Sequence, residues 1–282
     1  MTEYAHPEAL VSTEWVAENL GKPNVKLVEV DVDNEAYNQG HIQGAVSWNW
    51  TTQLNDATQR DILSKDQFEA LMSQSGISPS DTVILYGDNN NWFAAFALWQ
   101  MKVNGHNDAR LMNGGRKKWV DVENRPTTTD VPSPAPSTYK VSNRDEAALR
   151  ARVFDVNDVV KGAKENLIDV RSPAEFSGEV IAPPGMTETA QRGGHIPGAA
   201  NVPWAKAAND DGTFKSADEL KALYEGEAHL DPSKPTIAYC RIGERSSHTW
   251  FALKYLLGYP DVRNYDGSWT EWGSMVANPI EK

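Results

Sequence analysis

The sequence repeats itself once over most of its length, and this duplication limits the possible folds more than any other feature. Three pairs of segments match, namely 27–45 with 167–199, 82–86 with 236–239, and 109–119 with 262–272. The first pair shares the element HIQGA or HIPGA, which differs at one position. A repeat of this length indicates duplicated domains rather than the short units of a solenoid.

The chain between the two copies reads PTTTDVPSPAPS at 126–137, with four prolines and almost no apolar residues to bury. Such a segment favours an extended, semi-rigid connector. We therefore predict one domain at 1–125, a proline-rich linker at 126–137, and a second domain at 138–282. The second copy carries an insertion at about 178–191.

Within each copy, short runs of β-branched and apolar residues alternate with helical patterns. The predicted strands are 27–30, 82–86, 109–112, 167–170, 236–239 and 262–265, and the predicted helices are 12–21, 66–76, 92–105 and 246–258. The last residue of each of these stretches is glycine, the residue type that most often comes directly after the end of a helix. The alternation predicts an α/β fold in which each domain has a central, mainly parallel sheet flanked by helices. In such folds the active site lies beyond the carboxyl ends of the strands.

The charge balance and the cysteine content exclude several classes of function. Lys plus Arg number 27 against 39 Asp plus Glu, a net charge of -12, so we expect no nucleic-acid and no membrane partner. No secretory signal and no run of about 18 apolar residues is visible, which favours a cytoplasmic protein. The single cysteine, Cys240, excludes an internal disulfide and a multi-cysteine metal site, and we expect neither metal nor cofactor.

Cys240 follows the predicted strand TIAY and precedes Arg-Ile-Gly-Glu-Arg-Ser and a predicted helix. Backbone N–H groups and the helix dipole favour an anion at such a junction. We expect these amides, with Arg241 and Arg245, to lower the pKa of the Cys240 thiol from its usual value of about 8.5. Two arginines and a glycine directly after a strand are poor core material, so a reactive thiol is favoured over a cysteine that only packs.

The loop CRIGERS, together with DVRSPAEF at 169–176, GHIPGAANVP at 194–203 and YDGSWTEW at 265–272, resembles the rhodanese family. The tandem layout is similar to that of thiosulfate sulfurtransferases of the actinobacterial kind. The resemblance implies two rhodanese-like α/β domains. It also implies that Cys240 takes the outer sulfur of thiosulfate as a persulfide, releases sulfite and passes the sulfur to cyanide or a thiol acceptor, either a small thiol or a thioredoxin-like protein.

The same resemblance implies roles for three further residues of the loop. Arg245 would bind the sulfonate end of the donor and Arg241 would supply a second cation, since guanidinium geometry suits such an anion. Gly243 would leave room for backbone amides to approach the sulfur. We expect Arg245 to be an exposed loop cation that contributes little to stability.

Outside the loop, two anion contacts each allow two interpretations. Arg171, in DVRSP, either contacts the anion or forms a structural ion pair with Asp169. Some tandem members carry an arginine four residues later, where this chain has Glu175. That contact would be absent here, or Arg192 in the insertion would supply it.

Three alternatives differ in what they require of the loop. Cysteine phosphatases place cysteine and arginine six positions apart, whereas Cys240 and Arg245 are five apart, which predicts a cradle too small for a phosphoryl group. The mercaptopyruvate branch of the family has an uncharged residue after the cysteine, so Arg241 and Arg245 favour the dianion thiosulfate. A non-catalytic sulfur-carrier or binding module remains open.

The first copy lacks the nucleophile, because Gly87 or Asp88 occupies the position of Cys240. We therefore interpret the first domain as non-catalytic. It would either shape one wall of a cleft between domains or only stabilise the second domain.

Overall fold

The computed structural model describes residues 3–185 and 188–282, which form two compact units. The first unit comprises Pro7–Glu146 and Asn209–Phe214. The second unit comprises Ala147–Ala208 and Lys215–Lys282, with the described residues that precede Pro7. The proline-rich segment 126–137, predicted as a linker, thus lies in the first unit.

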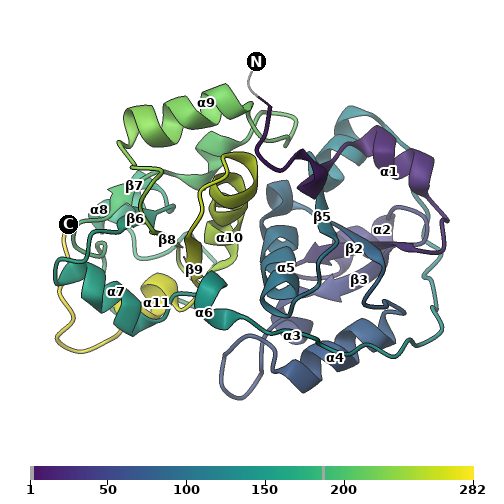
Figure 1. Cartoon of the computed structure of the whole chain (residues 1–282), viewed down its shortest axis with the longest axis horizontal. Coiled ribbons are helices and arrows are strands. Elements are labelled where there is room, and N and C mark those ends of the chain that lie inside the picture. The colour runs from purple at the N-terminus through teal and green to yellow at the C-terminus, as the bar shows by residue number, and fades with distance from the viewer. Residues whose placement is uncertain (1–2, 186–187) are drawn as a thin grey trace. The chain divides into compact units, whose positions relative to one another are not determined.

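The first unit is built on a five-stranded sheet in which every strand pair is parallel (Figure 1). Its strand order is β1-β5-β4-β2-β3. The strands are β1 (Leu10–Val11), β2 (Val25–Asp31), β3 (Val46–Asn49), β4 (Thr82–Tyr86) and β5 (Ala109–Met112). The helices are α1 (Thr13–Asn19), α2 (Glu35–Gln39), α3 (Trp50–Gln53), α4 (Lys65–Gln74) and α5 (Trp92–Val103), with short helical turns at Pro7–Ala9, Asn89–Asn91 and Lys117–Val122.

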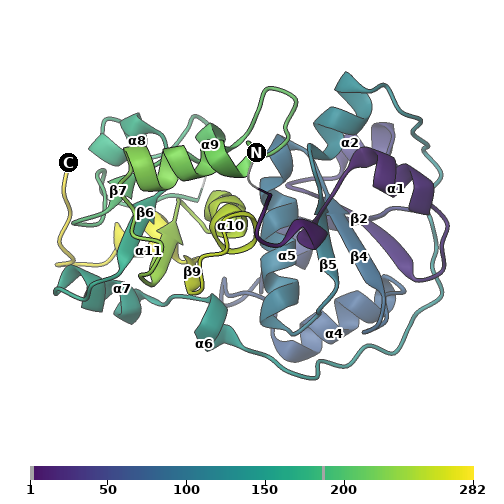
Figure 2. The same ribbon diagram turned by 45° about the horizontal axis from the view of Figure 1, so that its top comes forward.

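The second unit repeats this plan with a four-stranded parallel sheet of order β7-β6-β8-β9 (Figure 2). The strands are β6 (Asn166–Asp169), β7 (Ala200–Asn201), β8 (Thr236–Tyr239) and β9 (Val262–Tyr265). The helices are α7 (Val153–Val160), α8 (Pro173–Ser177), α9 (Ala217–Lys221), α10 (Glu244–Phe251) and α11 (Ser268–Trp272), with turns at Trp204–Ala207, Ala222–Glu227 and Ala252–Leu256. Helix α6 (Glu146–Leu149) begins in the first unit and ends in the second. The predicted α/β fold with a parallel sheet in each half is confirmed.

Helices cover both faces of each sheet, which explains why the central strands are apolar throughout. Every residue of β4 and of β8 is buried. In the first unit Val16 of α1 and Ile84 of β4 belong to the same hydrophobic core, and α5 contacts β2, β4 and β5. In the second unit Val156 of α7 and Trp269 of α11 share a core with Ile237 of β8, and α10 contacts β8 and β9.

The predicted helix ends are confirmed by the backbone. Gly21, Gly76, Gly105 and Gly258 have φ values of 75°, 66°, 75° and 76°, in the left-handed region that glycine adopts without a steric penalty. The extent of one helix was less well predicted. Helix α10 begins at Glu244, two residues before the predicted start, and therefore begins inside the CRIGERS loop.

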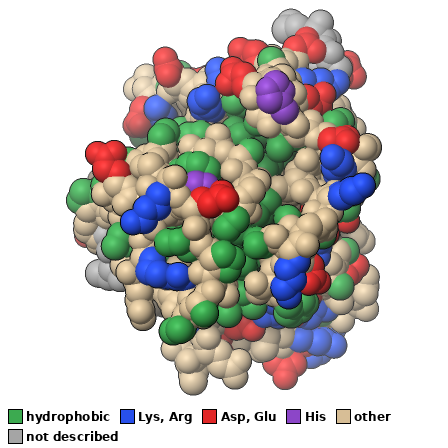
Figure 3. Space-filling view, turned by 90° about the vertical axis from the view of Figure 1, so that its left-hand side faces the viewer, with side chains coloured by type: hydrophobic (Ala, Val, Ile, Leu, Met, Phe, Trp, Pro, Cys, Tyr) green, Lys and Arg blue, Asp and Glu red, His purple; other side chains and the backbone are tan. Residues whose placement is uncertain are grey.

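None of the helices within 3–185 and 188–282 combines the length and the apolar character needed to cross a membrane. On the face shown in Figure 3, acidic and basic side chains are interspersed rather than gathered by sign. An anion would therefore be attracted by a particular group of side chains and not by the charge of this whole face.

Two of the helix-ending glycines provide a matched test of close packing. Gly21 and Gly105 share a φ of 75°, but a Cβ on Gly105 would lie 2.2 Å from the Asn143 carbonyl oxygen, whereas a Cβ on Gly21 would meet nothing within 4 Å. Gly21→Ala should lower the free energy of unfolding by about 1 kcal/mol, the cost of the left-handed backbone alone. Gly105→Ala should cost at least twice as much in urea denaturation. Equal losses would contradict this packing.

Candidate active site

Cys240 lies directly after β8, at the carboxyl end of the parallel sheet, and its side chain is fully buried. Its Sγ accepts the N–H of Gly243 at 3.1 Å, and Ser246 Oγ lies 3.6 Å away and donates to Asn264 Oδ1 at 2.6 Å. The Cys240 N–H donates to the Ser268 hydroxyl oxygen at 3.1 Å. The chain from Cys240 to the start of α10 is therefore folded around the sulfur.

Gly243 is required at its position for two reasons. Its φ is 99°, and a Cβ there would lie 2.7 Å from the Asp266 Cα. The Asp266 carboxylate accepts two hydrogen bonds from Arg150, at 2.7 and 2.8 Å, and both side chains are buried. This ion pair fixes the backbone against which Gly243 packs, and Gly243 in turn supplies the amide that contacts Sγ.

A carboxylate lies beside the sulfur. The Cys240 thiol donates to Glu244 Oε2 at 3.4 Å, and Glu244 Oε1 lies 3.8 Å from Arg241 Nη2 and 3.7 Å from Arg245 Nε. Burial of the thiol and the negative charge of Glu244 raise the pKa of Cys240, and the Arg245 charge and the Ser246 hydrogen bonds lower it by less. The prediction of a lowered thiol pKa is wrong, because it counted amides and arginines and omitted desolvation and this carboxylate.

Arg245 is buried, and the prediction that it is an exposed loop cation is wrong. Only 6% of its surface is exposed. Its Nη1 and Nη2 each donate to an oxygen of Glu175 in α8 at 3.0 Å. Burial alone would raise the pKa of Glu175, but the hydrogen bonds and the charge of Arg245 lower it. Glu175 also accepts the N–H of Ser172 at the start of α8, so it joins this helix to the cysteine loop.

Arg241 points toward the insertion that distinguishes the second copy. Its Nη1 donates to the backbone carbonyl of Glu188. Residues 186–187 of the predicted insertion lie outside the described residues. Arg192, weighed as a substitute anion contact, donates instead to the carbonyls of Gly273 and Asn278 at 3.0 and 2.9 Å. Arg192 thus ties the insertion to the segment after α11.

Arg171 is fully buried at the end of β6 and forms an ion pair with Asp169. It also donates to the Gly194 carbonyl at 2.7 Å, and its guanidinium lies 4.7 Å from the centre of the Trp269 ring. Of the two roles considered for Arg171, the geometry supports the structural ion pair with Asp169. The arrangement orders the edge of the sheet next to the cysteine loop.

Sequence reasoning missed two residues that contact Cys240. Glu244 was considered only as part of a charged loop, although its position four residues after the cysteine and at the start of a helix could have indicated it. Ser268 has a φ of 52°, unusual for a residue with a Cβ, and its hydroxyl also donates to the Tyr265 carbonyl at 2.6 Å. Alignment of the two copies places Gly115 opposite Ser268. A glycine at that position of the repeat could have indicated the left-handed backbone that Ser268 adopts.

In the first unit the equivalent position is built differently. Gly87 follows β4, and its N–H donates to Asn91 Oδ1 at 3.0 Å. Asp31 at the end of β2 accepts the Asp88 N–H at 2.8 Å. Burial and the facing Asp88 carboxylate raise the pKa of Asp31 to about 9. This half therefore holds a carboxyl pair where the second half holds a thiol.

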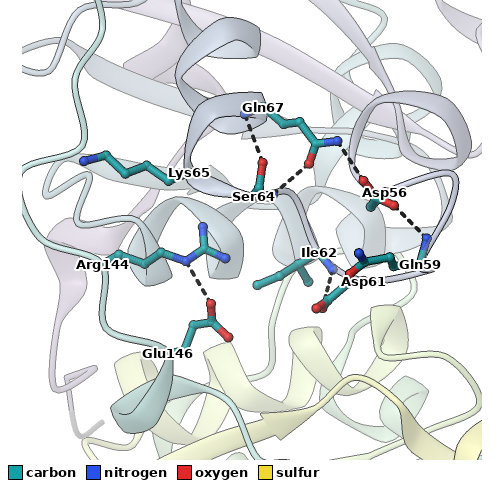
Figure 4. A pocket seen from close by; sticks show the side chains of 9 residues that line it. All are labelled: Asp56, Gln59, Asp61, Ile62, Ser64, Lys65, Gln67, Arg144 and Glu146. Carbon is teal, nitrogen blue, oxygen red and sulfur yellow. Dashed lines mark hydrogen bonds and ion pairs between the residues drawn. The ribbon is translucent and has the colours of Figure 1, made fainter.

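A surface pocket of about 400 Å³ in the first unit, shown in Figure 4, offers no comparable chemistry. Asp56 within it accepts the N–H groups of Thr58 and Gln59 and the amide of Gln67. Gln67 in turn completes the cap of α4 with Ser64. These polar groups stabilise a turn and a helix end, so the second unit remains the place where covalent chemistry is available.

Comparison with known proteins identifies relatives of both halves. The family described as Rhodanese-like domain matches residues 12–121 and 154–275. The chain is 56% identical to "Sulfur carrier protein TtuD" of Thermus thermophilus, over 99% of this chain and 98% of that protein. It is 55% identical to a Haloferax volcanii protein named "Putative thiosulfate sulfurtransferase", over 100% of this chain and 98% of that protein.

A solved structure gives the same result for the fold. The structure titled as SseA from Escherichia coli, a 3-mercaptopyruvate sulfotransferase, superimposes with a TM-score of 0.79 at 26% identity. The match covers 93% of this chain and 98% of that one. Both halves therefore have the fold of known sulfur-transferring proteins.

The ion pair between Arg245 and Glu175 can be tested by its contribution to stability. Arg245→Met should lower the free energy of unfolding by about 3–5 kcal/mol, because it leaves a buried carboxylate without a cation. Adding Glu175→Gln, which keeps an oxygen for the Ser172 N–H, should recover part of that loss in chemical denaturation. A double variant as unstable as the sum of the single variants would contradict the pairing.

The pair of Asp31 and Asp88 predicts that replacing Asp31 stabilises the protein by an amount that depends on pH. Between pH 4 and 9 the folded state keeps a proton on Asp31 that the unfolded state releases, so stability falls as the pH rises. Asp31→Asn removes this penalty and lets an amide donate to Asp88. The penalty grows by about 1.4 kcal/mol per pH unit in this range, so Asp31→Asn should raise the melting temperature at pH 8, and this increase should become smaller toward pH 4. The exposed control Asp33→Asn should show no such trend, and an Asp31→Asn gain that is independent of pH would refute the account.

Proposed function

The chain belongs to the rhodanese family, and from this premise we propose that it is a thiosulfate sulfurtransferase acting through a persulfide of Cys240. The observation that carries the proposal is a buried sulfur at a strand-to-helix junction, held by the Gly243 N–H and next to Glu244, which lies 3.8 and 3.7 Å from Arg241 and Arg245. The relatives at 55% identity or more are consistent with sulfur transfer as the chemistry.

The reaction consists of two displacements at sulfur. The Cys240 thiolate attacks the outer sulfur of thiosulfate, the S–S bond of the donor breaks, and sulfite leaves with the bonding electron pair. Cyanide or a thiol then attacks the outer sulfur of the persulfide, and the Cys240 thiolate leaves. A covalent intermediate of this kind divides one transfer into two steps, and it needs no second cysteine, which this chain does not have.

The residues around Cys240 suit these steps. The Gly243 N–H, which donates to Sγ at 3.1 Å, stabilises negative charge on sulfur in both displacements. Arg241 and Arg245 would attract the sulfonate group and stabilise the departing sulfite. Glu175 holds the Arg245 guanidinium with two hydrogen bonds of 3.0 Å before the donor arrives, and Glu244 lies near the Arg241 and Arg245 side chains. Arg171, paired with Asp169, would position the strand end rather than contact the donor.

The choice of thiosulfate as donor is supported by charge. Thiosulfate is a dianion, whereas mercaptopyruvate carries one carboxylate, and two guanidinium groups near one sulfur match the former more closely. The acceptor is cyanide or a thiol, which includes a small thiol or a thioredoxin-like protein. Since the cysteine must be reduced to begin the reaction, we propose the cytoplasm as its location.

A second function is favoured by the name of one relative. The Thermus thermophilus protein is named a sulfur carrier, and a carrier would load the same Cys240 persulfide and release its sulfur only to a partner protein. The two functions differ in the second step alone, so turnover with a small acceptor distinguishes them.

Thiosulfate should add one sulfur atom, about 32 Da, to the intact protein and release one equivalent of sulfite. Cys240→Ser should do neither while melting at a similar temperature. Cyanide should then return the mass to its starting value and yield thiocyanate, and mercaptopyruvate should load the protein more slowly. Sulfite release by Cys240→Ser would refute the proposal, and loading without cyanide turnover would favour the carrier function.

A further inference from the structure

Glu244 contacts the reacting sulfur atom, and the two displacements described above give it no part in bond making. Its Oε2 accepts from the Cys240 thiol at 3.4 Å, and only 3% of the residue is exposed. The family resemblance assigns it no role. A buried carboxylate on a nucleophilic sulfur needs an explanation, because it opposes the thiolate that the reaction requires.

A purely structural role explains the position of Glu244 poorly. Its Oε1 lies 3.8 Å from Arg241 Nη2 and 3.7 Å from Arg245 Nε, which is too far for a direct hydrogen bond. Arg245 is instead held by two bonds of 3.0 Å to Glu175. The closest approach of Glu244 to an ionisable partner among these contacts is therefore the one to Sγ.

Charge balance favours a proton transfer between these two groups. Two carboxylates, Glu175 and Glu244, lie among two guanidinium groups, Arg241 and Arg245. Moving the proton from the thiol to Glu244 relocates one negative charge inside this group and leaves its total unchanged. Releasing the same proton to water would instead leave an additional buried charge, which is costly. Asp266, on the far side of Gly243, is neutralised by Arg150.

We propose that Glu244 is the base that removes the proton of the Cys240 thiol and the acid that then gives it to the departing sulfite. This inference rests on the proposed function. In the first step the proton passes from Sγ to Oε2. In the second the Sγ–S bond forms, the S–S bond of thiosulfate breaks, and sulfite leaves with the electron pair and takes the proton as hydrogen sulfite. Glu244 returns to its charged form, and no oxidant or reductant is consumed.

The two arginines then have a second effect besides attracting the donor. The Arg245 charge, which acts to lower the pKa of Cys240, favours the negative charge on sulfur after the proton has moved, and both guanidinium groups lie near the carboxylate that receives the proton. The burial that raises the pKa of the thiol thereby keeps the resting protein as an uncharged thiol, which attacks only when the carboxylate accepts the proton. Glu244 is a catalytic residue in this account, because it contacts the reacting atom.

The test is the pH dependence of sulfite release in a single turnover with thiosulfate, compared between the wild type and Glu244→Gln. The wild-type rate should be nearly constant from pH 6 to 8, because the proton moves inside the protein. In Glu244→Gln the thiol must lose its proton to water, so the rate should rise about tenfold per pH unit and be at least tenfold below the wild type at pH 6. Glu175→Gln, which removes a charge that does not contact Sγ, should lower the rate at every pH, because Arg245 loses its partner, but should keep the flat profile.

The outcomes separate the two proposals. The thiolate absorbance near 240 nm should titrate in Glu244→Gln at a pH no higher than in the wild type, since a repelling charge is gone. A Glu244→Gln protein that releases sulfite as fast as the wild type with the same pH profile overturns the role of Glu244 and leaves the sulfurtransferase intact. A wild-type protein that releases no sulfite contradicts the proposed function itself, and with it the delivery of the proton to sulfite.

Discussion

The contact between the Cys240 thiol and the Glu244 carboxylate is the interaction on which the second unit's site depends. A thiol beside a buried carboxylate is a poor nucleophile until its proton moves. The surrounding groups reduce that cost, since Arg241 and Arg245 lie near the same carboxylate and Gly243 donates its N–H to the sulfur. The site thus combines a protected resting thiol with a local path for its proton.

The two halves show how one backbone plan supports different chemistry. Each half buries a carboxylate on its first central strand, Glu29 in one and Asp169 in the other, and pairs it with an arginine. In the first half that arginine is Arg116, which comes after β5, whereas in the second it is Arg171, which lies two residues after the last residue of β6. The repeat aligns Arg116 with Trp269, and the Arg171 guanidinium lies 4.7 Å from the centre of the Trp269 ring.

The sequence predicted the elements well where a local pattern determines them. Strands β4, β5, β8 and β9 have the predicted bounds, because TVILY and TIAY are short, largely apolar runs and ARLM and VRNY occupy matching positions in the two copies. The two-residue strands β1 and β7 carry too few residues for any pattern to reveal. The ion pair of Arg245 with Glu175 joins residues 70 positions apart, and spacing alone contains no information about such a contact. The raised pKa of Cys240 was missed for the same reason, since burial is a property of the whole fold.

A crystal structure of the protein after reaction with thiosulfate tests the central claim most directly. The account predicts one additional sulfur atom bonded to Cys240 Sγ within reach of the Gly243 N–H, and a Glu244 carboxylate that no longer accepts a hydrogen bond from a thiol. The account would be contradicted by protein that has released sulfite into solution and yet shows an unmodified Cys240 whose thiol is still hydrogen-bonded to Glu244.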